Sequence, residues 1–176
     1  SVITGTGSKS YWKVLWDRVS GDEELSYVDV ENMDSQETED LDEVQLFNEI
    51  RKETGVSPVR FGYMPKNLFF TGYELDKEQN RAIIFYKYNG QVIRYSMYMN
   101  NSDSSHGQTE LDDLIDEYQI DTQNEINVDI KVYIVDDSDE NRYAAEFEYM
   151  DAQYRIMGVM EKDEFDKIIE NLIFLQ

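Results

Sequence analysis

Residues 126–134 carry the pattern that most limits what this chain can fold into. Every second position of this segment is β-branched: Ile126, Val128, Ile130, Val132 and Ile134. Successive side chains of a strand point to opposite faces, so these five share one face. The pattern predicts a half-buried strand, with Asn127, Asp129 and Lys131 on the opposite face.

Further strands are predicted on both sides of this segment. They are expected at residues 59–64, 69–75, 81–88, 91–99, 143–149 and 154–160. Asn89-Gly90 separates two of them and is typical of a type I′ hairpin turn, which needs positive φ at both central residues. The short connections predict an antiparallel meander.

The N-terminal quarter of the chain is harder to interpret. The small residues of segment 1–9 are typical of a linker. Apolar residues in segment 10–30 fit helical and strand spacing equally well, and β propensity favours a hairpin. Eight acids and no basic residue lie between Asp29 and Glu43, which predicts a solvated loop.

Two helices are expected to pack on the sheet. The first has an apolar stripe of Val44, Phe47 and Ile50, widened by Leu46, and ends at Gly55. The second has a stripe of Phe165, Ile168, Ile169, Leu172 and Ile173. Ile130 and Ile169 are expected in one core. A third, short helix is considered within the polar segment 102–123, over Leu111, Leu114, Ile115 and Tyr118.

The fold class that follows is α+β: a twisted antiparallel β-sheet, packed on one face by an N-terminal-side helix and a C-terminal helix. The domain organisation expected is a linker at 1–9, a hairpin-like segment and acidic loop at 10–42, and an α+β domain at 43–176. We find no internal repeat.

Composition excludes several functions. The formal net charge of -22 opposes binding to nucleic acid or to anionic lipid. Zero Cys and a single His, His106, remove disulfides, thiolate metal sites and multi-His metal sites. No stretch reaches the ~18 apolar residues of a membrane helix. The chain begins at Ser1 without a Met, so we expect an upstream segment, such as a membrane anchor, to precede it.

The sequence offers no candidate catalytic, cofactor-binding or metal-ligating residue. Asp137, Asp139, Asn141 and Glu148 match an EF-hand count, but Arg142 stands where that loop needs Gly. His106 is interpreted as an exposed loop residue. Acidic pairs are too frequent among 38 acids to indicate a catalytic dyad.

Tyrosines are the most prominent side chains of the predicted strands. They are Tyr86, Tyr88, Tyr95, Tyr98, Tyr133, Tyr143, Tyr149 and Tyr154. Exposed tyrosines would make a partner- or glycan-binding face, whereas buried ones would line the core with their hydroxyls at its rim. The core interpretation is favoured.

An amphipathic helix, a Gly turn at Gly55 and the step Pro58-Val59-Arg60-Phe61-Gly62-Tyr63-Met64-Pro65 follow one another in the sequence. Through these features, residues 43–175 resemble the DUF4367 family. The resemblance implies the extracytoplasmic part of a single-pass membrane protein of Gram-positive bacteria, in some cases resembling an anti-sigma factor. No catalytic residue is carried over.

The function expected is therefore a non-enzymatic, extracytoplasmic sensory or interaction domain of a membrane-anchored regulator. Its partner would be a protein or an envelope ligand, with no nucleic acid, no cofactor and no membrane insertion by this segment. The alternatives are an envelope glycan hydrolase that uses paired carboxylates and an acidic domain that binds a divalent cation.

Overall fold

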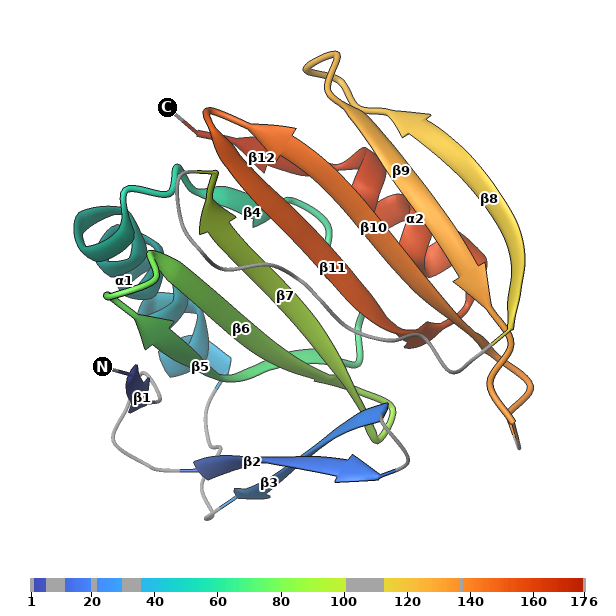
Figure 1. Cartoon of the computed structure of the whole chain (residues 1–176), viewed down its shortest axis with the longest axis horizontal. Coiled ribbons are helices and arrows are strands. Elements are labelled where there is room, and N and C mark those ends of the chain that lie inside the picture. The colour runs from blue at the N-terminus through green and yellow to red at the C-terminus, as the bar shows by residue number, and fades with distance from the viewer. Residues whose placement is uncertain are drawn as a thin grey trace.

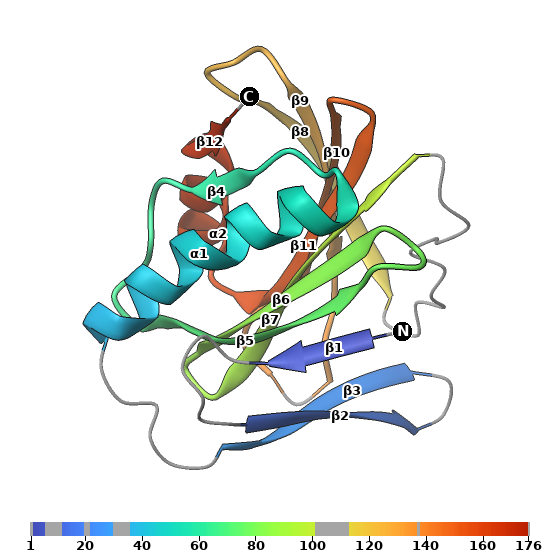
Figure 2. The same cartoon turned by 90° about the vertical axis from the view of Figure 1, so that its left-hand side faces the viewer.

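The computed structural model of the chain describes residues 2–5, 12–19, 22–29, 36–100, 113–136 and 138–175, with side chains from residue 43 onward. Within these residues, eight strands form one antiparallel sheet (Figure 1). Helices α1 and α2 lie on the same side of this sheet, as Figure 2 shows. The predicted α+β class is confirmed.

The large sheet consists of two meanders placed side by side. One is β5 (Leu68–Asp76), β6 (Arg81–Tyr88) and β7 (Gln91–Met99); the other is β8 (Leu114–Asp121), β9 (Asn127–Tyr133), β10 (Asn141–Tyr149) and β11 (Ala152–Met160). Strand β7 pairs with β11 and thereby joins the meanders, and β1 (Val2–Gly5) adds to β5. The turn between β6 and β7 has φ of 48° at Asn89 and 81° at Gly90, as its sequence predicts.

Two separate pairs of strands accompany the large sheet. Strand β2 (Trp12–Val19) pairs with β3 (Asp22–Asp29), so the hairpin expected in segment 10–30 is confirmed. Strand β4 (Val59–Phe61) pairs with β12 (Leu172–Phe174). The segment after α2 (Lys162–Glu170) was predicted as helix, and this part of the prediction is wrong. Leu172 and Ile173 instead belong to strand β12, and β4 is the only described strand that pairs with it.

The acidic segment does not remain a loop up to residue 43. Helix α1 (Gln36–Thr54) begins within it, because acids in the first turns of a helix interact favourably with its positive dipole end. The buried face of α1 contains Glu43, Leu46, Phe47 and Ile50, whereas Val44 is 41% exposed. The predicted stripe was therefore correct except at Val44. The helix ends at Gly55, which has a φ of 83° and whose N–H donates to the Arg51 carbonyl at 3.0 Å.

Two further predictions need correction. The expected linker at residues 1–9 contributes strand β1, since its Val, Ile and Thr favour strands and β5 has an edge to pair with. Leu114, Ile115 and Tyr118 were considered, with Leu111, for a short helix but lie on strand β8 beside β9. Its isolated apolar positions fit both periods, and pairing with β9 decides between them. Leu111 lies outside the described residues.

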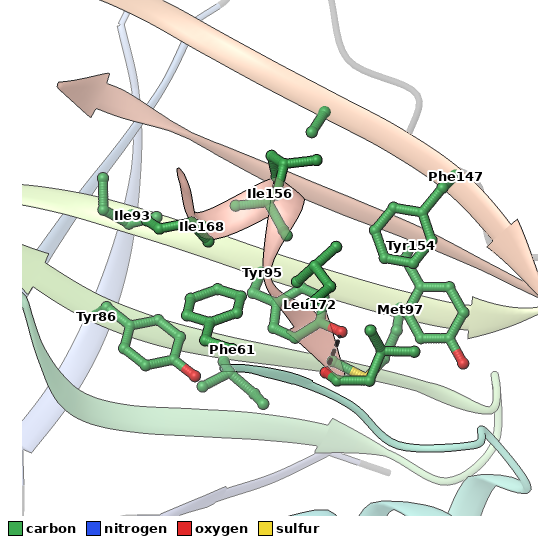
Figure 3. Close-up of a cluster of buried hydrophobic side chains, with 14 of the residues drawn as sticks. Phe61, Tyr86, Ile93, Tyr95, Met97, Phe147, Tyr154, Ile156, Ile168 and Leu172 are labelled. Atoms are coloured by element: carbon green, nitrogen blue, oxygen red, sulfur yellow. Dashed lines mark hydrogen bonds between the residues drawn. The ribbon is translucent and has the colours of Figure 1, made fainter. Parts of the chain in front are cut away.

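The core lies between the large sheet and its helices. Tyr86, Tyr95, Tyr154, Ile130 and Ile169 belong to it, each at most 1% exposed, and Figure 3 shows part of the cluster. The predicted shared core of Ile130 and Ile169 is thus confirmed, and Asn127 and Asp129 are exposed on the other face. Ile134 departs from the pattern. It is 43% exposed, because β9 ends one residue earlier, at Tyr133.

Candidate functional site

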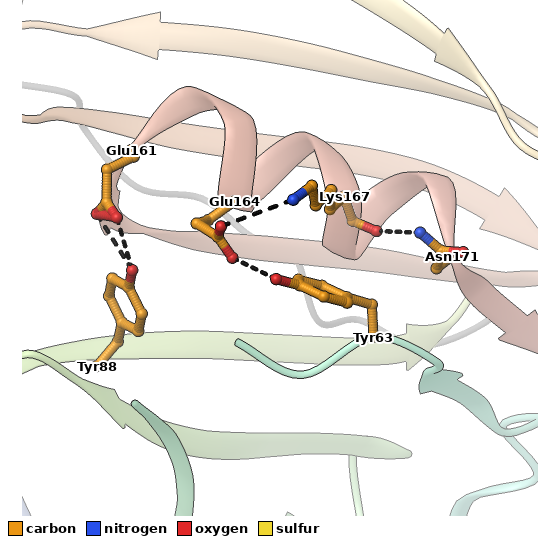
Figure 4. A network of polar contacts seen from close by, with 6 residues as sticks. All are labelled: Tyr63, Tyr88, Glu161, Glu164, Lys167 and Asn171. Carbon is orange, nitrogen blue, oxygen red and sulfur yellow. Dashed lines mark hydrogen bonds and ion pairs between the residues drawn. The ribbon is translucent and has the colours of Figure 1, made fainter. Parts of the chain in front are cut away.

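Tyrosine hydroxyls connect helix α2 to the rest of the fold. Tyr63, which follows β4, donates to a carboxylate oxygen of Glu164 at 2.6 Å. Tyr88, at the end of β6, donates to Glu161, which precedes the first turn of α2, at 2.7 Å (Figure 4). Both acceptors are carboxylates, and hydrogen bonds to charged groups are stronger than neutral ones. These contacts tie the N-terminal half of α2 to the segment after β4 and to the end of β6.

A third such bond joins α2 to the edge of the large sheet. The hydroxyl of Tyr118, on β8, donates to Asp166 at 2.6 Å. The ammonium of Lys162 lies 2.6 Å from the same carboxylate and 4.4 Å from the centre of the Tyr118 ring. Burial, followed by the bond to Asp166, raises the pKa of Tyr118 above its usual value. Tyr118 is therefore protonated wherever the protein is folded near neutral pH.

A hydrogen bond from a tyrosine to a carboxylate is also present at helix α1, and there both residues are buried. Tyr86 donates to Glu43 at 2.5 Å, and the Glu43 residue is 7% exposed. Burial and the adjacent Glu43 carboxylate raise the pKa of Tyr86 well above its usual value. Tyr95 and Tyr154 donate to backbone carbonyls, of Val59 at 2.6 Å and of Ser57 at 2.5 Å, and so hold the segment between α1 and β4 against the sheet.

These contacts decide between the two interpretations of the strand tyrosines. Tyr86, Tyr88, Tyr95, Tyr133, Tyr143 and Tyr154 are at most 5% exposed, and Tyr98 and Tyr149 are half-buried. The core interpretation is confirmed for five of the six buried residues, whereas Tyr133 is buried outside the core cluster. The pairing of particular tyrosines with particular acids has no signal in the sequence, because the partners lie 43 to 101 residues apart in the chain.

The residues of the EF-hand count are not brought together. Asn141 is the first residue of β10 and Glu148 lies seven positions further along the same strand, which separates them by about 23 Å at ~3.3 Å per residue. The side-chain amide of Asn100 donates to Glu148 at 2.7 Å. Asp137 and His106 lie outside the described residues. Among those described, no three His, Cys, Asp or Glu side chains are grouped as a metal ion would need.

Strand β8 is the most exposed strand of the large sheet for which side chains are described. Six of its eight residues are exposed, and only Tyr118 and Ile120 are half-buried against the core. It stands at the end of the strand order, and β9 is the only described strand that pairs with it (Figure 1). An edge of this kind offers backbone hydrogen-bonding groups to another chain. It is the feature of the described molecule best suited to an interaction.

No helix in the described part of the chain is both long and apolar enough to cross a membrane.

Comparison with known proteins identifies a family but no individual relative. The model of the family described as "Domain of unknown function (DUF4367)" matches residues 58–172, from just before β4 to the start of β12. Neither the curated proteins nor the solved structures contain a match. The matched region covers well over half of the chain and includes the complete second meander and helix α2. The chain therefore belongs to the DUF4367 family.

Proposed function

We propose that this chain is a non-enzymatic interaction domain, the extracytoplasmic part of a membrane-anchored regulator. In this function, a protein or envelope ligand binds outside the membrane and shifts the anchored protein between two states. The observation that carries the proposal is the structural role of the tyrosine and carboxylate side chains. The buried and half-buried tyrosines and acids bond to one another and hold the helices on the sheet.

This use of the acids argues against glycan hydrolysis. A glycosidase needs two carboxyl groups that flank the scissile bond, one of them protonated by an apolar environment. Glu161, Glu164 and Asp166 lie on or beside α2, and each accepts a hydrogen bond from a tyrosine of another element. A substrate at these carboxylates would displace contacts that position the helix. The hydrolase is therefore the less favoured function.

The compartment is proposed from family membership, and the class of partner from the net charge. Family membership supports an extracytoplasmic domain that is anchored through an upstream helix, as the resemblance implies for other members. The net charge of -22 makes binding of nucleic acid unfavourable, since the phosphate backbone carries the same sign. The proposed partners are thus proteins or envelope components.

Two measurements test this function. The purified chain is incubated with bacterial cell-wall glycan and with chromogenic glycosides, and its melting temperature is measured with and without calcium. We expect no turnover and no calcium-dependent rise. Turnover that disappears when one carboxylate is replaced, as in Glu164→Gln, with Asp129→Asn as the matched surface control, would establish the hydrolase instead.

The location is tested separately on the full-length protein. Intact and lysed cells are treated with a protease that cannot cross the membrane, and the domain is followed with an antibody. Cleavage in intact cells is the expected result. Protection until lysis would contradict the extracytoplasmic location.

A further inference from the structure

Backbone groups on the outer side of β8 can be assigned from its pairing with β9. The N–H of Thr122 donates to the carbonyl of Ile126 at 3.0 Å, so these two residues form a hydrogen-bonded pair. Hydrogen-bonded pairs recur at every second position of an antiparallel ladder. Tyr118 and Ile120, which lie opposite Ile130 and Val128, therefore direct their backbone groups toward β9.

The residues between them direct their backbone groups away from the sheet. These are Glu117, Gln119 and Asp121. One independent contact agrees with this assignment: the N–H of Glu117 donates to its neighbour, the Asp116 carboxylate, at 2.9 Å and not to β9. The N–H groups of Gln119 and Asp121 have no such partner among the described residues. They form the hydrogen-bonding edge that a further strand would use.

The charge of this edge selects what can pair with it. Residues 113–126 contain five acids, namely Asp113, Asp116, Glu117, Asp121 and Glu125, and no Lys or Arg. A second copy of the chain would place the same acids opposite one another, and like charges directly opposite are destabilising in a sheet. A segment with Lys or Arg at alternate positions would place opposite charges there instead.

Apolar side chains lie at one end of the same edge. Leu114 and Ile115 are each 49% exposed, and Ile134, the residue after β9, is 43% exposed. The N–H of Ile134 donates to the carbonyl of Asp113 at 2.9 Å, which holds the two segments together at this end. A partner would find apolar surface where β8 begins and negative charge along the rest of the strand.

We propose that the β8 edge binds an extended, basic segment of a partner protein, which adds to the large sheet as a further strand. Main-chain hydrogen bonds to Gln119 and Asp121 provide the pairing, and the acids of β8 select the partner by charge. The inference rests on the proposed function and names its surface and its class of partner.

The decisive variant removes one backbone N–H without changing the net charge. Gln119→Pro removes an outward N–H and leaves the ladder to β9 intact, a position where an edge strand tolerates proline. Gln119→Ala is the matched control, because it removes the same side chain and its 2.6 Å bond to Asp129 but keeps the N–H. Both variants keep the net charge of -22.

The probe is a synthetic peptide of about ten residues in which Lys alternates with Thr and Val, a length that matches a strand. A peptide with Glu in place of Lys is its control. We expect the Lys peptide to bind the complete chain, the Glu peptide not to bind, Gln119→Pro to weaken binding at least tenfold, and Gln119→Ala to change it less than twofold. Equal binding by Gln119→Pro and the unmodified chain would overturn the proposal, because the peptide would then be held by charge alone.

Amide exchange in the unmodified chain provides a test that does not depend on the folding of a variant. Bound Lys peptide should slow hydrogen exchange at Gln119 and Asp121. Unchanged exchange at both amides would contradict strand addition, and edge-to-edge dimers in sedimentation would make a second copy the occupant. Failure of this inference leaves an interaction domain with another surface, whereas failure of the proposed function would appear as glycan turnover.

Discussion

Strands β9 and β8 are neighbours that run antiparallel, yet only β9 is buried along one face for its full length. Val128, Ile130 and Val132 of β9 are at most 3% exposed, whereas six of the eight residues of β8 are exposed. Tyr118 and Ile120 are the residues through which β8 reaches the core. The two strands have eight and seven residues, so their positions in the sheet, and not their lengths, account for the difference in burial.

The largest expected effect follows from this difference in burial. Ile130→Asp places a carboxylate at a site that is 1% exposed, where an unpaired charge costs several kcal/mol against a typical stability of ~5–15 kcal/mol. The variant should be unfolded or close to it in urea titrations. The comparison variant on β8, Ile120→Asp, should remain folded with a smaller loss, because Ile120 is half-buried. Similar losses at both positions would mean that the edge is packed as tightly as the interior.

Alkaline pH should destabilise the protein through its buried tyrosines. Burial raises the pKa of Tyr86, Tyr95 and Tyr154 in the fold, whereas a tyrosine of the unfolded chain titrates near 10. Below about pH 10 the folded and unfolded states carry the same tyrosine protons, and the stability from these groups is complete. Above that pH the unfolded chain releases protons that the folded chain keeps, so the free energy of unfolding falls.

Ultraviolet titration of tyrosinate combined with urea unfolding measures this effect. Tyrosine ionisation should coincide with unfolding, and the free energy of unfolding should decrease from about pH 9 upward. Ionisation of most tyrosines in a protein that remains folded would contradict the burial of their hydroxyls.

Two hydrogen bonds of the same chemistry allow the interior and the edge to be compared directly. Tyr118→Phe removes the bond from β8 to Asp166, which keeps Lys162 as a partner, and should lower the free energy of unfolding by about 1 kcal/mol. Tyr86→Phe removes the bond to Glu43 where both residues are buried, and its loss should be larger. Equal losses in the free energy of unfolding would show that exposure does not change how much these hydrogen bonds stabilise the fold.

The sequence predicts best where one face of an element is buried without interruption. The alternation in residues 126–134 gave strand β9 and its register, and Asn89-Gly90 gave the hairpin turn, because period two and positive φ leave few alternatives. Strand β8 has apolar residues at only four positions, which fit a helix as well as a strand. Its conformation depends on pairing with β9, which is a long-range property that local spacing does not contain.

The sequence did not predict the proposed β8 edge for the same reason. An edge exists only once the order of the strands is known, and that order joins β7 to β11 across some 50 residues of sequence. The acids of β8 were visible in the sequence, but acids are frequent throughout this chain. The acids of β8 differ from the others because they lie beside backbone groups that point away from the sheet.

The smallest expected effect concerns the exposed face that β9 and β8 share. Asp129→Ala changes an exposed residue whose described hydrogen bond comes from the Gln119 side chain at 2.6 Å. Exposed strand positions of this kind change stability by less than about 0.5 kcal/mol. Asp129→Ala, Gln119→Ala and the double variant form a cycle that isolates the bond between the two strands, and its coupling should lie within the same limit. A loss for Asp129→Ala as large as that for Ile130→Asp would place Asp129 in the core, and the outward face of β8 would then be the buried one.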